Sequence, residues 1–377
     1  MTDTAQDTGA LGREAAVFAR IEAFRRRRPR LLDDVVTLSH GAGGKASAAL
    51  LDAVFLPAFA PDAFAGDAFA GDAPAAQTDA AVLTLPSGER LAFSTDSFVV
   101  KPLRFPGGSV GHLAVHGTVN DLAMMGARPL ALSAAFVLEE GFPIDALREI
   151  VADMAEAAAA AGVSIVTGDT KVVDRGAADG MYISTAGVGL IPAGRELSAE
   201  KVREGDVVLS SGTIGDHGTA VMLARGDLAL EADIESDTAP LHGLMESLLA
   251  AAPSTRWLRD ATRGGVGTVC NELARDTNLT VVLEESLLPV RPAVAAACEL
   301  LGIDPLYVAN EGKLLAVVAP EEAEVALAAL RSHPLGGDAT RIGEIFAEPP
   351  GLVVLRTTLG GTRIVDMLVG DPLPRIC

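Results

Sequence analysis

Ser109-Val-Gly-His-Leu-Ala-Val-His-Gly-Thr-Val-Asn-Asp-Leu-Ala-Met-Met-Gly126 is the stretch that indicates how the first part of the chain folds. Its apolar side chains recur at three- and four-residue spacing, which predicts a helix over 110–125. Ser109 is placed to cap the start of this helix, and Gly126 lies just beyond its end. The segment is otherwise small and apolar, so the carboxylate of Asp121 needs a partner.

Strand-like and helical patterns alternate on both sides of this helix. In the first unit we expect strands at 91–95, 130–138, 164–167 and 182–188, with a second helix at 143–161 that has proline at its start and Gly162 past its end. In a second unit we expect strands at 207–209, 280–283 and 314–318, and helices at 219–225, 241–251, 264–275, 292–301 and 321–331. The sequence therefore predicts an α/β (α+β) protein of two domains, each with helices packed on a mixed sheet.

Composition shifts suggest the domain limits. We expect an N-terminal extension at 1–37, within which 14–28 has a helical pattern, and an N-terminal domain at 38–190. The repeat Asp62-Ala-Phe-Ala-Gly66, Asp67-Ala-Phe-Ala-Gly71 marks 57–77 as a low-complexity insertion. A linker at 191–205, a C-terminal domain at 206–348 and a C-terminal segment with the tail at 349–377 complete the division.

Charge and cysteine content exclude several classes of protein. The chain of 377 residues has a formal net charge of −20, which argues against nucleic acid as a partner. An anion such as ATP would need a metal ion, local lysines or helix N-termini to offset that charge. The three cysteines are an odd number and form no disulfide framework. With a polar start and no apolar run of membrane-spanning length, the sequence predicts a cytoplasmic protein.

The tail Asp371-Pro-Leu-Pro-Arg-Ile-Cys377 carries a thiol on an extended segment. Its two prolines forbid a helix or a central strand there. Chain ends are commonly mobile, so we expect a flexible tail whose cysteine can enter a pocket and leave it again. A frayed end that has cysteine by chance is the alternative.

A glycine-rich turn lies at His40-Gly-Ala-Gly-Gly-Lys45. Consecutive glycines let backbone N–H groups approach an anion, and the lysine adds positive charge. The spacing does not match a P-loop, and an ordinary turn is the alternative.

Several carboxylates are expected at the ends of strands. Asp79 precedes the apolar run at 80–83, Asp96 follows the strand at 91–95, and Asp169 follows the strand at 164–167. Together with Asn120-Asp121 they could supply the oxygen ligands that Mg²⁺ prefers. The alternative for each is a turn or a helix cap, but Asp121 lies within an apolar helix and does not fit that alternative.

Charged residues in other predicted loops are further candidates. Lys171 follows Asp169, and Glu311 precedes the strand at 314–318; they could act as charge stabiliser and general base, or form surface ion pairs. Arg259-Asp-Ala-Thr-Arg-Gly-Gly265 begins a predicted helix, where Asp260 could be a simple cap and the N–H groups could hold an anion. The histidines show no metal-binding spacing. Cys270 and Cys298 lie in apolar helical patterns and are expected in the core.

Taken together, these motifs resemble the HypE family of hydrogenase-maturation proteins. The motifs that carry the resemblance, from Ser39 to Cys377, are Ser39-His-Gly-Ala-Gly-Gly-Lys45, Phe93-Ser-Thr-Asp-Ser97, Phe105-Pro-Gly-Gly108, Asn120-Asp121, Thr167-Gly-Asp-Thr-Lys-Val-Val173, Arg259-Asp-Ala-Thr-Arg-Gly-Gly265, Asn310-Glu-Gly-Lys313 and Pro374-Arg-Ile-Cys377. The terminal Pro-Arg-Ile-Cys is the specific part. The aspartates and glycines alone indicate only the wider superfamily of aminoimidazole-ribonucleotide synthetase and selenophosphate synthetase.

The resemblance implies an activity and its partners. It implies the two-domain fold of that superfamily and a homodimer in which the N-terminal sheets form a shared barrel. A carbamoyltransferase, HypF, would place a carbamoyl group on the terminal thiol, and ATP would drive dehydration of this S-carboxamide to an S-cyanate. The product would supply the cyanide ligand of [NiFe]-hydrogenase iron, which also implies a HypC–HypD complex as a partner.

The resemblance also assigns roles to residues of this chain. Cys377 would be the nucleophile and carrier, with Lys171 and Glu311 handling the amide proton and charge. Gly43, Gly44 and Lys45 would lie over the phosphates of ATP. Mg²⁺–ATP would be held by Asp79, Asp96 and Asp121 as metal ligands, with Asn120 and Asp169 nearby.

Two other functions remain open from the sequence. Another ATP-using synthetase of the superfamily would keep its activity on a small molecule without Cys377. A passive thiol carrier or docking protein would keep its activity in the pathway after Asp121→Asn. Fold alone does not choose among these readings.

Overall fold

The structure is a computed structural model, and it describes residues 31, 33–59, 78–226, 232–370, 373 and 375–377. The predicted helix at 14–28 lies outside these residues, as does nearly all of the predicted 57–77 insertion. In the part of the chain that the structure describes, the helices are all too short or too polar to cross a membrane.

The N-terminal domain is built on a five-stranded sheet in the order β1-β2-β7-β5-β6. Its strands are β1 (Ala81–Thr84), β2 (Arg90–Phe98), β5 (Arg128–Glu139), β6 (Ser164–Val173) and β7 (Met181–Ile191). All neighbouring pairs are antiparallel except β5 and β6, which are parallel. A short hairpin of β3 (Arg104–Phe105) and β4 (Gly108–Ser109) precedes the helix that fills the centre of the molecule.

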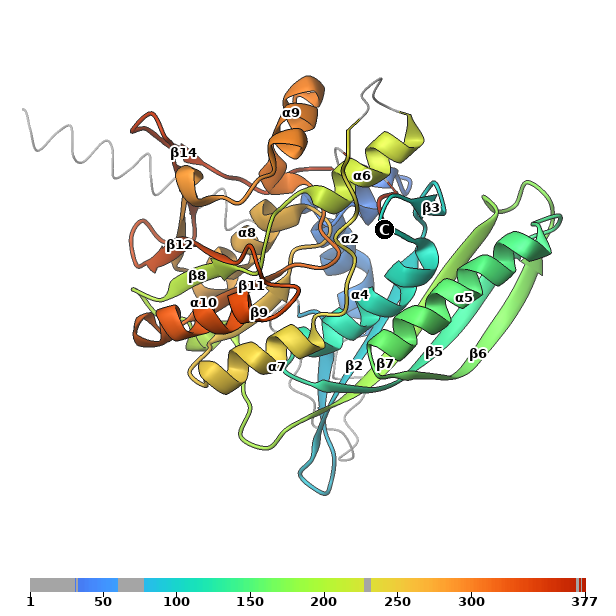
Figure 1. Cartoon of the computed structure of the whole chain (residues 1–377), viewed down its shortest axis with the longest axis horizontal. Helices are drawn as coiled ribbons and strands as arrows, with labels where there is room; N and C mark the ends of the chain where they lie inside the picture. The colour runs from blue at the N-terminus through green and yellow to red at the C-terminus, as the bar shows by residue number, and fades with distance from the viewer. Residues whose placement is uncertain (1–30, 32, 60–77, 227–231, 371–372, 374) are drawn as a thin grey trace, which may run out of the picture.

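That central helix is α4 (Val110–Met124), and it is buried almost throughout. The Ser109 hydroxyl caps it by accepting the N–H of Gly111 at 3.2 Å, as the sequence predicts. Small residues let it pack closely on the sheet, because a Cβ at position 117 would lie 2.9 Å from Cζ of Phe98. Helix α5 (Ile144–Ala160) packs beside α4, and both helices lie on one side of the sheet (Figure 1).

The second domain contains a seven-stranded sheet in the order β14-β13-β10-β12-β8-β11-β9. These strands are β8 (Val207–Ser210), β9 (Trp257–Asp260), β10 (Thr280–Glu284), β11 (Leu314–Val318), β12 (Thr340–Phe346), β13 (Val353–Arg356) and β14 (Thr362–Ile364). Its helices are α6 (Asp216–Arg225), α7 (His242–Ala251), α8 (Gly265–Thr277), α9 (Pro292–Leu301) and α10 (Ala323–Ser332). The sheet continues past the domain boundary predicted at 348, since it includes β13 and β14. The sequence does not reveal these two strands because they are short.

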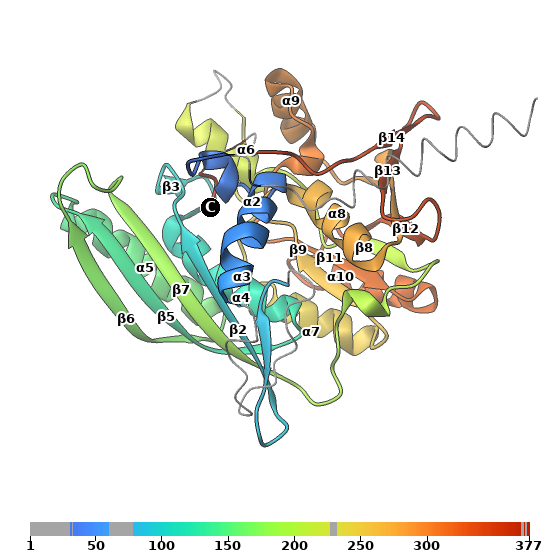
Figure 2. The ribbon, with the colours of Figure 1, turned by 180° about the vertical axis from the view of Figure 1, so that it is seen from behind.

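A helical N-terminal segment lies against the C-terminal part of the chain. It consists of a 3-10 helix (Leu38–Gly41), α2 (Lys45–Leu50), a π-helical turn (Leu51–Phe55) and α3 (Leu56–Ala58). Its backbone is held by residues near the other end of the chain: the N–H of Lys45 donates to Leu368 O at 2.9 Å, and that of Ala46 to Val369 O at 3.3 Å. Figure 2 shows α2 and α3 from the side on which they lie in front.

Two of the predicted strands prove longer than expected, and this changes the position of two carboxylates. Asp96 lies within β2 rather than after it, and Asp169 lies within β6 rather than after it. Both strands continue because residues 96–98 and 168–173 find a complete partner in β7 and β5, which a sequence pattern does not show.

The tail is docked rather than free. The N–H of Val99 donates to Cys377 O at 3.0 Å, and the N–H of Lys101 donates to Arg375 O at 3.3 Å. The side chains of Leu373 and Ile376 are buried in the same apolar cluster as Phe98. The described residues of the tail therefore pair with the backbone that follows β2 and contribute to the core of the molecule, which is one of the two positions expected of a tail that can enter a pocket and leave it.

Candidate functional site

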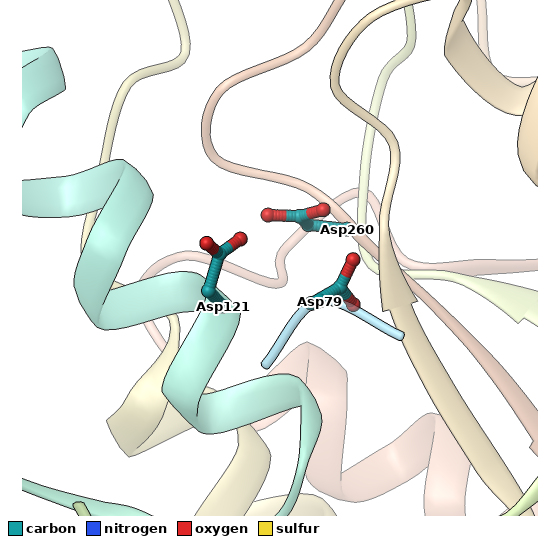
Figure 3. A group of neighbouring side chains, drawn as sticks. All are labelled: Asp79, Asp121 and Asp260. Atoms are coloured by element: carbon teal, nitrogen blue, oxygen red, sulfur yellow. The ribbon is translucent and has the colours of Figure 1, made fainter. Parts of the chain in front are cut away.

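Three carboxylates meet where the two domains face each other. Asp79 precedes β1, Asp121 lies on α4, and Asp260 ends β9 of the second sheet. One oxygen from each lies within 4.8 Å of the others, and the three carboxyl groups are turned toward a common space (Figure 3). Helix α4 packs against both sheets here, since it contacts β2, β7 and β9.

Asp260 is buried and Asp79 and Asp121 are partly buried, and the pKa values of all three are displaced accordingly. Burial, and then the charges of Asp260, Asp79 and Asp96, raise the pKa of Asp121 well above its usual value, and a hydrogen bond from Ser94 Oγ only partly opposes this. Burial raises the pKa of Asp79 well above normal, and it raises the pKa of Asp260 to about 6. The negative charge of these three carboxylates must therefore be neutralised by protons or by a cation.

One cation already lies beside the cluster, but it does not satisfy it. Arg259 Nε lies 2.8 Å from Asp79 Oδ1, and its Nη2 lies 3.1 Å from Glu272 Oε2. Burial would lower the pKa of Arg259, but the surrounding carboxylates hold it above the usual value. The other oxygen of Asp79 and one oxygen of Asp260 are buried without a hydrogen-bond partner among the described residues. Unpaired buried oxygens of this kind fit a hard divalent cation such as Mg²⁺.

Asp96 borders this group without belonging to it. Its Oδ1 accepts the N–H of Ser97 at 2.7 Å, and burial raises its pKa while Arg263 lowers it. Its charge acts on both Asp121 and Asp260. The sequence therefore selects two members of the cluster and one neighbour, and treats the third member, Asp260, as a possible cap. The signal that could have found Asp260 is its place at the end of a strand, the position by which Asp79 and Asp96 were selected.

The glycine-rich turn lies against the Arg259–Gly265 motif. Arg263 Nη1 donates to Gly41 O at 2.6 Å, and a Cβ at the left-handed Gly43 would lie 3.2 Å from Cβ of Arg263. Lys45 Nζ lies 2.9 Å from Asp366 Oδ2. Gly44 has no room for a side chain, because its Cβ would lie 2.4 Å from Leu368 O. The turn is thus a neighbour of the carboxylate cluster through Arg263.

Asn120 and Glu311 lie behind the cluster and are linked to each other. Asn120 Nδ2 donates to Glu311 O at 3.2 Å and to Ala239 O at 3.1 Å, and its Oδ1 accepts the N–H of Leu241 at 2.7 Å. Its amide thus holds backbone in place. The Glu311 side chain is buried; burial, then Asp260, Asp96 and Asp237, raise its pKa well above the usual value. A buried carboxyl with a raised pKa suits a general base.

Asp169 and Lys171 are not brought to the cluster within one chain. They lie on β6, the edge strand of the first sheet, three strands away from β2. Both are exposed, and Lys171 Nζ lies 2.6 Å from Asp169 Oδ2. Hydrogen bonds from Lys171 and from the N–H of Thr170 lower the pKa of Asp169.

The three cysteines differ sharply in setting. Cys270 and Cys298 are buried, and burial raises the pKa of their thiols to about 12 and about 11. These are inert core residues, as expected from their apolar helical patterns. Cys377 is only partly buried, and its backbone pairs with Val99, three residues after Asp96. The structure therefore places the tail beside the strand that borders the carboxylate cluster.

Comparison with known families gives two matches that together span most of the chain. Residues 77–191 match the family described as AIR synthase related protein, N-terminal domain, and residues 203–355 match AIR synthase related protein, C-terminal domain. The curated carbamoyl dehydratase HypE of Rhodobacter capsulatus is 54% identical over 347 residues, covering 92% of this chain and 99% of that protein. The carbamoyl dehydratase HypE of Escherichia coli K12 is 48% identical over 342 residues, covering 91% and 99%.

Solved structures agree with the sequence relatives. A chain of a crystal structure described as a HypE–HypF complex aligns with a TM-score of 0.76 and 48% identity, covering 85% of this chain and 100% of that one. The crystal structure of hydrogenase maturation protein HypE in complex with ATP aligns with a TM-score of 0.74 and 46% identity, covering 91% and 100%.

Proposed function

Because this chain belongs to the HypE family of carbamoyl dehydratases, we propose that it dehydrates a carbamoyl group carried on its own Cys377 in a reaction driven by ATP. The family membership makes it a hydrogenase-maturation protein. The single observation that carries the residue-level proposal is the docked tail, which pairs with Val99 and Lys101 next to the carboxylate cluster.

The chemistry converts an amide into a nitrile. The amide oxygen of the S-carboxamide is a poor leaving group, so it first takes the γ-phosphoryl group of ATP. The nitrogen gives up both of its protons, the C–O bond breaks, and phosphate departs with the former amide oxygen. Sulfur then carries a cyano group, and ADP and phosphate are the other products. Most of the catalytic demand is therefore positioning and charge neutralisation.

We assign the metal part of the ATP site to Asp79, Asp121 and Asp260, with Asp96 beside them. The unpaired buried oxygens of Asp79 and Asp260 and the raised pKa values support this assignment. When bound, Mg²⁺ would neutralise the phosphate charge. Gly43, Gly44 and Lys45 are assigned to the phosphates, and the nearness of their turn to Arg263 supports this.

Glu311 is our candidate for the group that accepts the amide proton. Its buried carboxyl has a raised pKa, so at neutral pH it is closer to a working base than an ordinary glutamate. Asn120 fixes the backbone of Glu311 and acts through it.

Lys171 and Asp169 require a second copy of the chain if they are to act at all. Residues of the sheet that face away from α4 include Phe93, which is 43% exposed, and the β5 residues Ala135 and Val137, which pair with Asp169 and Lys171. An open, partly apolar sheet face fits a homodimer in which β6 of one copy approaches the site of the other.

Partners and compartment follow from the family chemistry. We propose that the carbamoyl group comes from a HypF carbamoyltransferase and that a HypC–HypD complex accepts the cyanide. The crystal structure of a related HypE with HypF supports the first. An odd number of cysteines, with no disulfide framework in the sequence, fits a reducing compartment, so we place the protein in the cytoplasm.

The test is the mass of the C-terminal peptide of the carbamoylated protein before and after Mg²⁺–ATP is added. The expected result is loss of one water at Cys377, absent in Asp121→Asn. An unchanged peptide mass in the wild type despite ATP binding would contradict the dehydratase and favour a passive carrier. Turnover of a small molecule by a Cys377→Ser variant would favour another synthetase.

A further inference from the structure

A buried histidine contacts the backbone of the tail. The sequence does not single this histidine out. His217 lies in the first turn of α6, is fully buried, and has its Nε2 3.0 Å from the carbonyl oxygen of Ile376. Its Nδ1 lies 2.8 Å from Ser236 Oγ, and its ring packs edge-on against Phe105 with centroids 5.4 Å apart. The residue that precedes the thiol carrier is therefore in contact with a rigidly packed imidazole.

The proton on this imidazole can be placed from its partners. A carbonyl oxygen only accepts, so Nε2 must carry the proton and donate to Ile376 O. Burial lowers the pKa of His217, which keeps the ring neutral and leaves Nδ1 as an acceptor. Ser236 must then donate its hydroxyl proton to Nδ1, and its oxygen accepts the N–H of Thr238 at 3.2 Å. The hydrogen bonds thus run in one direction, from Thr238 to the tail.

Ser236 and Thr238 belong to a strap, residues 236–241, that also holds Glu311. Asp237 Oδ1 accepts the N–H of Glu311 at 3.0 Å. Asn120 of α4 binds the same strap at Ala239 and Leu241, and His116 Nδ1 lies 3.1 Å from Thr238 Oγ1. One short segment is consequently bonded on one side to the histidine that contacts the tail and on the other to the backbone of the proposed base.

Building on the proposed function, we propose that His217 is a positioning residue that seats the tail, and that strap 236–241 keeps the seated Cys377 in register with Glu311. His217 donates to Ile376 O, while Ser236 fixes the ring and Asp237 fixes Glu311. Because one segment holds both the thiol carrier and the base, the two groups do not have to be positioned separately before the proton is transferred.

The test uses the full-length protein with two substitutions at the same position. His217→Phe keeps the packing on Phe105 but removes both hydrogen bonds, whereas the amide of His217→Gln can still donate to Ile376 O. Two rates are measured: alkylation of Cys377 by N-ethylmaleimide, read by peptide mass, and single-turnover loss of water from the carbamoylated tail after Mg²⁺–ATP is added. His333→Phe, at the residue that directly follows α10 in the same domain, is the matched control.

We expect His217→Phe to speed alkylation and slow dehydration, each by roughly fivefold, the effect of one lost buried hydrogen bond. His217→Gln should recover most of both rates, and the affinity for Mg²⁺–ATP should stay at the wild-type value, which general damage to the fold would not permit. Ser236→Ala, which removes the donor to Nδ1, should move both rates in the same direction as His217→Phe.

Wild-type rates in both His217→Phe and Ser236→Ala would overturn the proposal, as would an equal defect in His217→Phe and His217→Gln. If the wild-type tail loses no water under these conditions, the proposed function fails instead. The alkylation rates then still decide whether His217 holds the tail.

Discussion

Asp79, Asp121 and Asp260 show how a fold can keep like charges together at a cost to its own stability. Each is supplied by a different element, and the backbone of those elements is fixed by packing rather than by the carboxylates. Burial away from water, and then repulsion among the carboxylates, raise the pKa values of the three groups. A site that is unfavourable when empty would bind a cation more tightly.

This repulsion predicts the pH dependence of the metal-free protein. The pKa of Asp260 is raised to about 6 from 3.8, so the folded state binds the proton more strongly than the unfolded state. The free energy of unfolding should therefore decrease as the pH rises from about 4 to about 6, by an amount on the order of 2 kcal/mol for this residue. Urea unfolding in EDTA at several pH values measures it.

Asp260→Asn should flatten this profile and raise the stability above pH 6, whereas the exposed Asp145→Asn should leave the profile unchanged. Mg²⁺ should also flatten the profile of the wild type, and it should stabilise Asp260→Asn much less. A wild-type stability that is constant between pH 4 and pH 6 in EDTA would contradict the assignment of a strained, cation-dependent cluster.

At the scale of elements, strand β6 is where pattern reading and structure differ most. The sequence predicts a strand at 164–167, and the structure extends it to Val173. The polar run Gly168-Asp-Thr-Lys171 looks like a loop because nothing in a single sequence shows that β5 supplies its hydrogen-bond partners. Helix α4, in contrast, is predicted nearly to the residue, because its cap, its apolar spacing and its final glycine are all local signals.

The same locality explains what could be predicted of the site. The sequence selects Asp79 by its place next to a predicted strand, and Asp121 because a carboxylate departs from the apolar pattern of its helix. It leaves Asp260 as a possible cap, because the other two carboxylates are more than a hundred residues away in the chain. The contact between His217 and Ile376 joins residues 159 positions apart and leaves no local trace. The sequence therefore predicts secondary-structure elements and candidate functional residues. Which of these residues come into contact depends on how the two domains pack.

The exposed face of the first sheet leads to a prediction about the proposed homodimer: a charge placed on this face should prevent it from forming. Phe93 lies in β2 on the face opposite α4 and is 43% exposed. Phe93→Asp would place a charge in the proposed dimer interface, so we expect a monomer by light scattering, with dehydration reduced at least tenfold if Lys171 acts on the partner's site. Val325→Asp, an equally exposed change on α10, should leave the assembly intact. A Phe93→Asp protein that keeps the wild-type mass in solution would exclude this face as the interface.

Across the molecule, the two domains are joined by a partly exposed ion pair as well as by α4. Arg195 of the linker binds Glu246 of α7 through two hydrogen bonds of 2.8 Å, and Arg128 at the start of β5 adds one of 3.0 Å. Arg195 also donates to Gly126 O, at the end of α4. These bonds thus hold the end of α4, the helix that carries one carboxylate of the cluster, against the linker and α7.

The stabilisation that Glu246 provides depends on pH in a predictable way. Hydrogen bonds from Arg195, and then from Arg128, lower the pKa of Glu246 to about 2 from 4.5, so its stabilisation is present above about pH 4.5 and is lost as the pH falls toward 2. Glu246→Gln should lower the free energy of unfolding by about 1–2 kcal/mol at pH 7, after allowance for partial exposure. Urea unfolding at pH 7 and pH 3 measures the difference.

That difference should shrink at pH 3, where the wild-type carboxylate begins to take up its proton. The exposed Glu324→Gln in α10 should change stability little at either pH. An equal loss at both pH values would mean that Glu246 acts by packing rather than by charge.

The burial of Leu373 and Ile376 in the main apolar cluster has a consequence for any protein that must reach Cys377. A partner can bind the tail only in the fraction of molecules in which it is released, and each buried aliphatic side chain favours the docked state by roughly 1.5–3 kcal/mol. The apparent affinity of the proposed carbamoyltransferase partner would then be weaker than its contact affinity in proportion to that fraction. Ile376→Ala should enlarge the released population and tighten the measured affinity, unless the partner itself buries Ile376. The two side chains thus set how often the thiol of Cys377 is available to any partner.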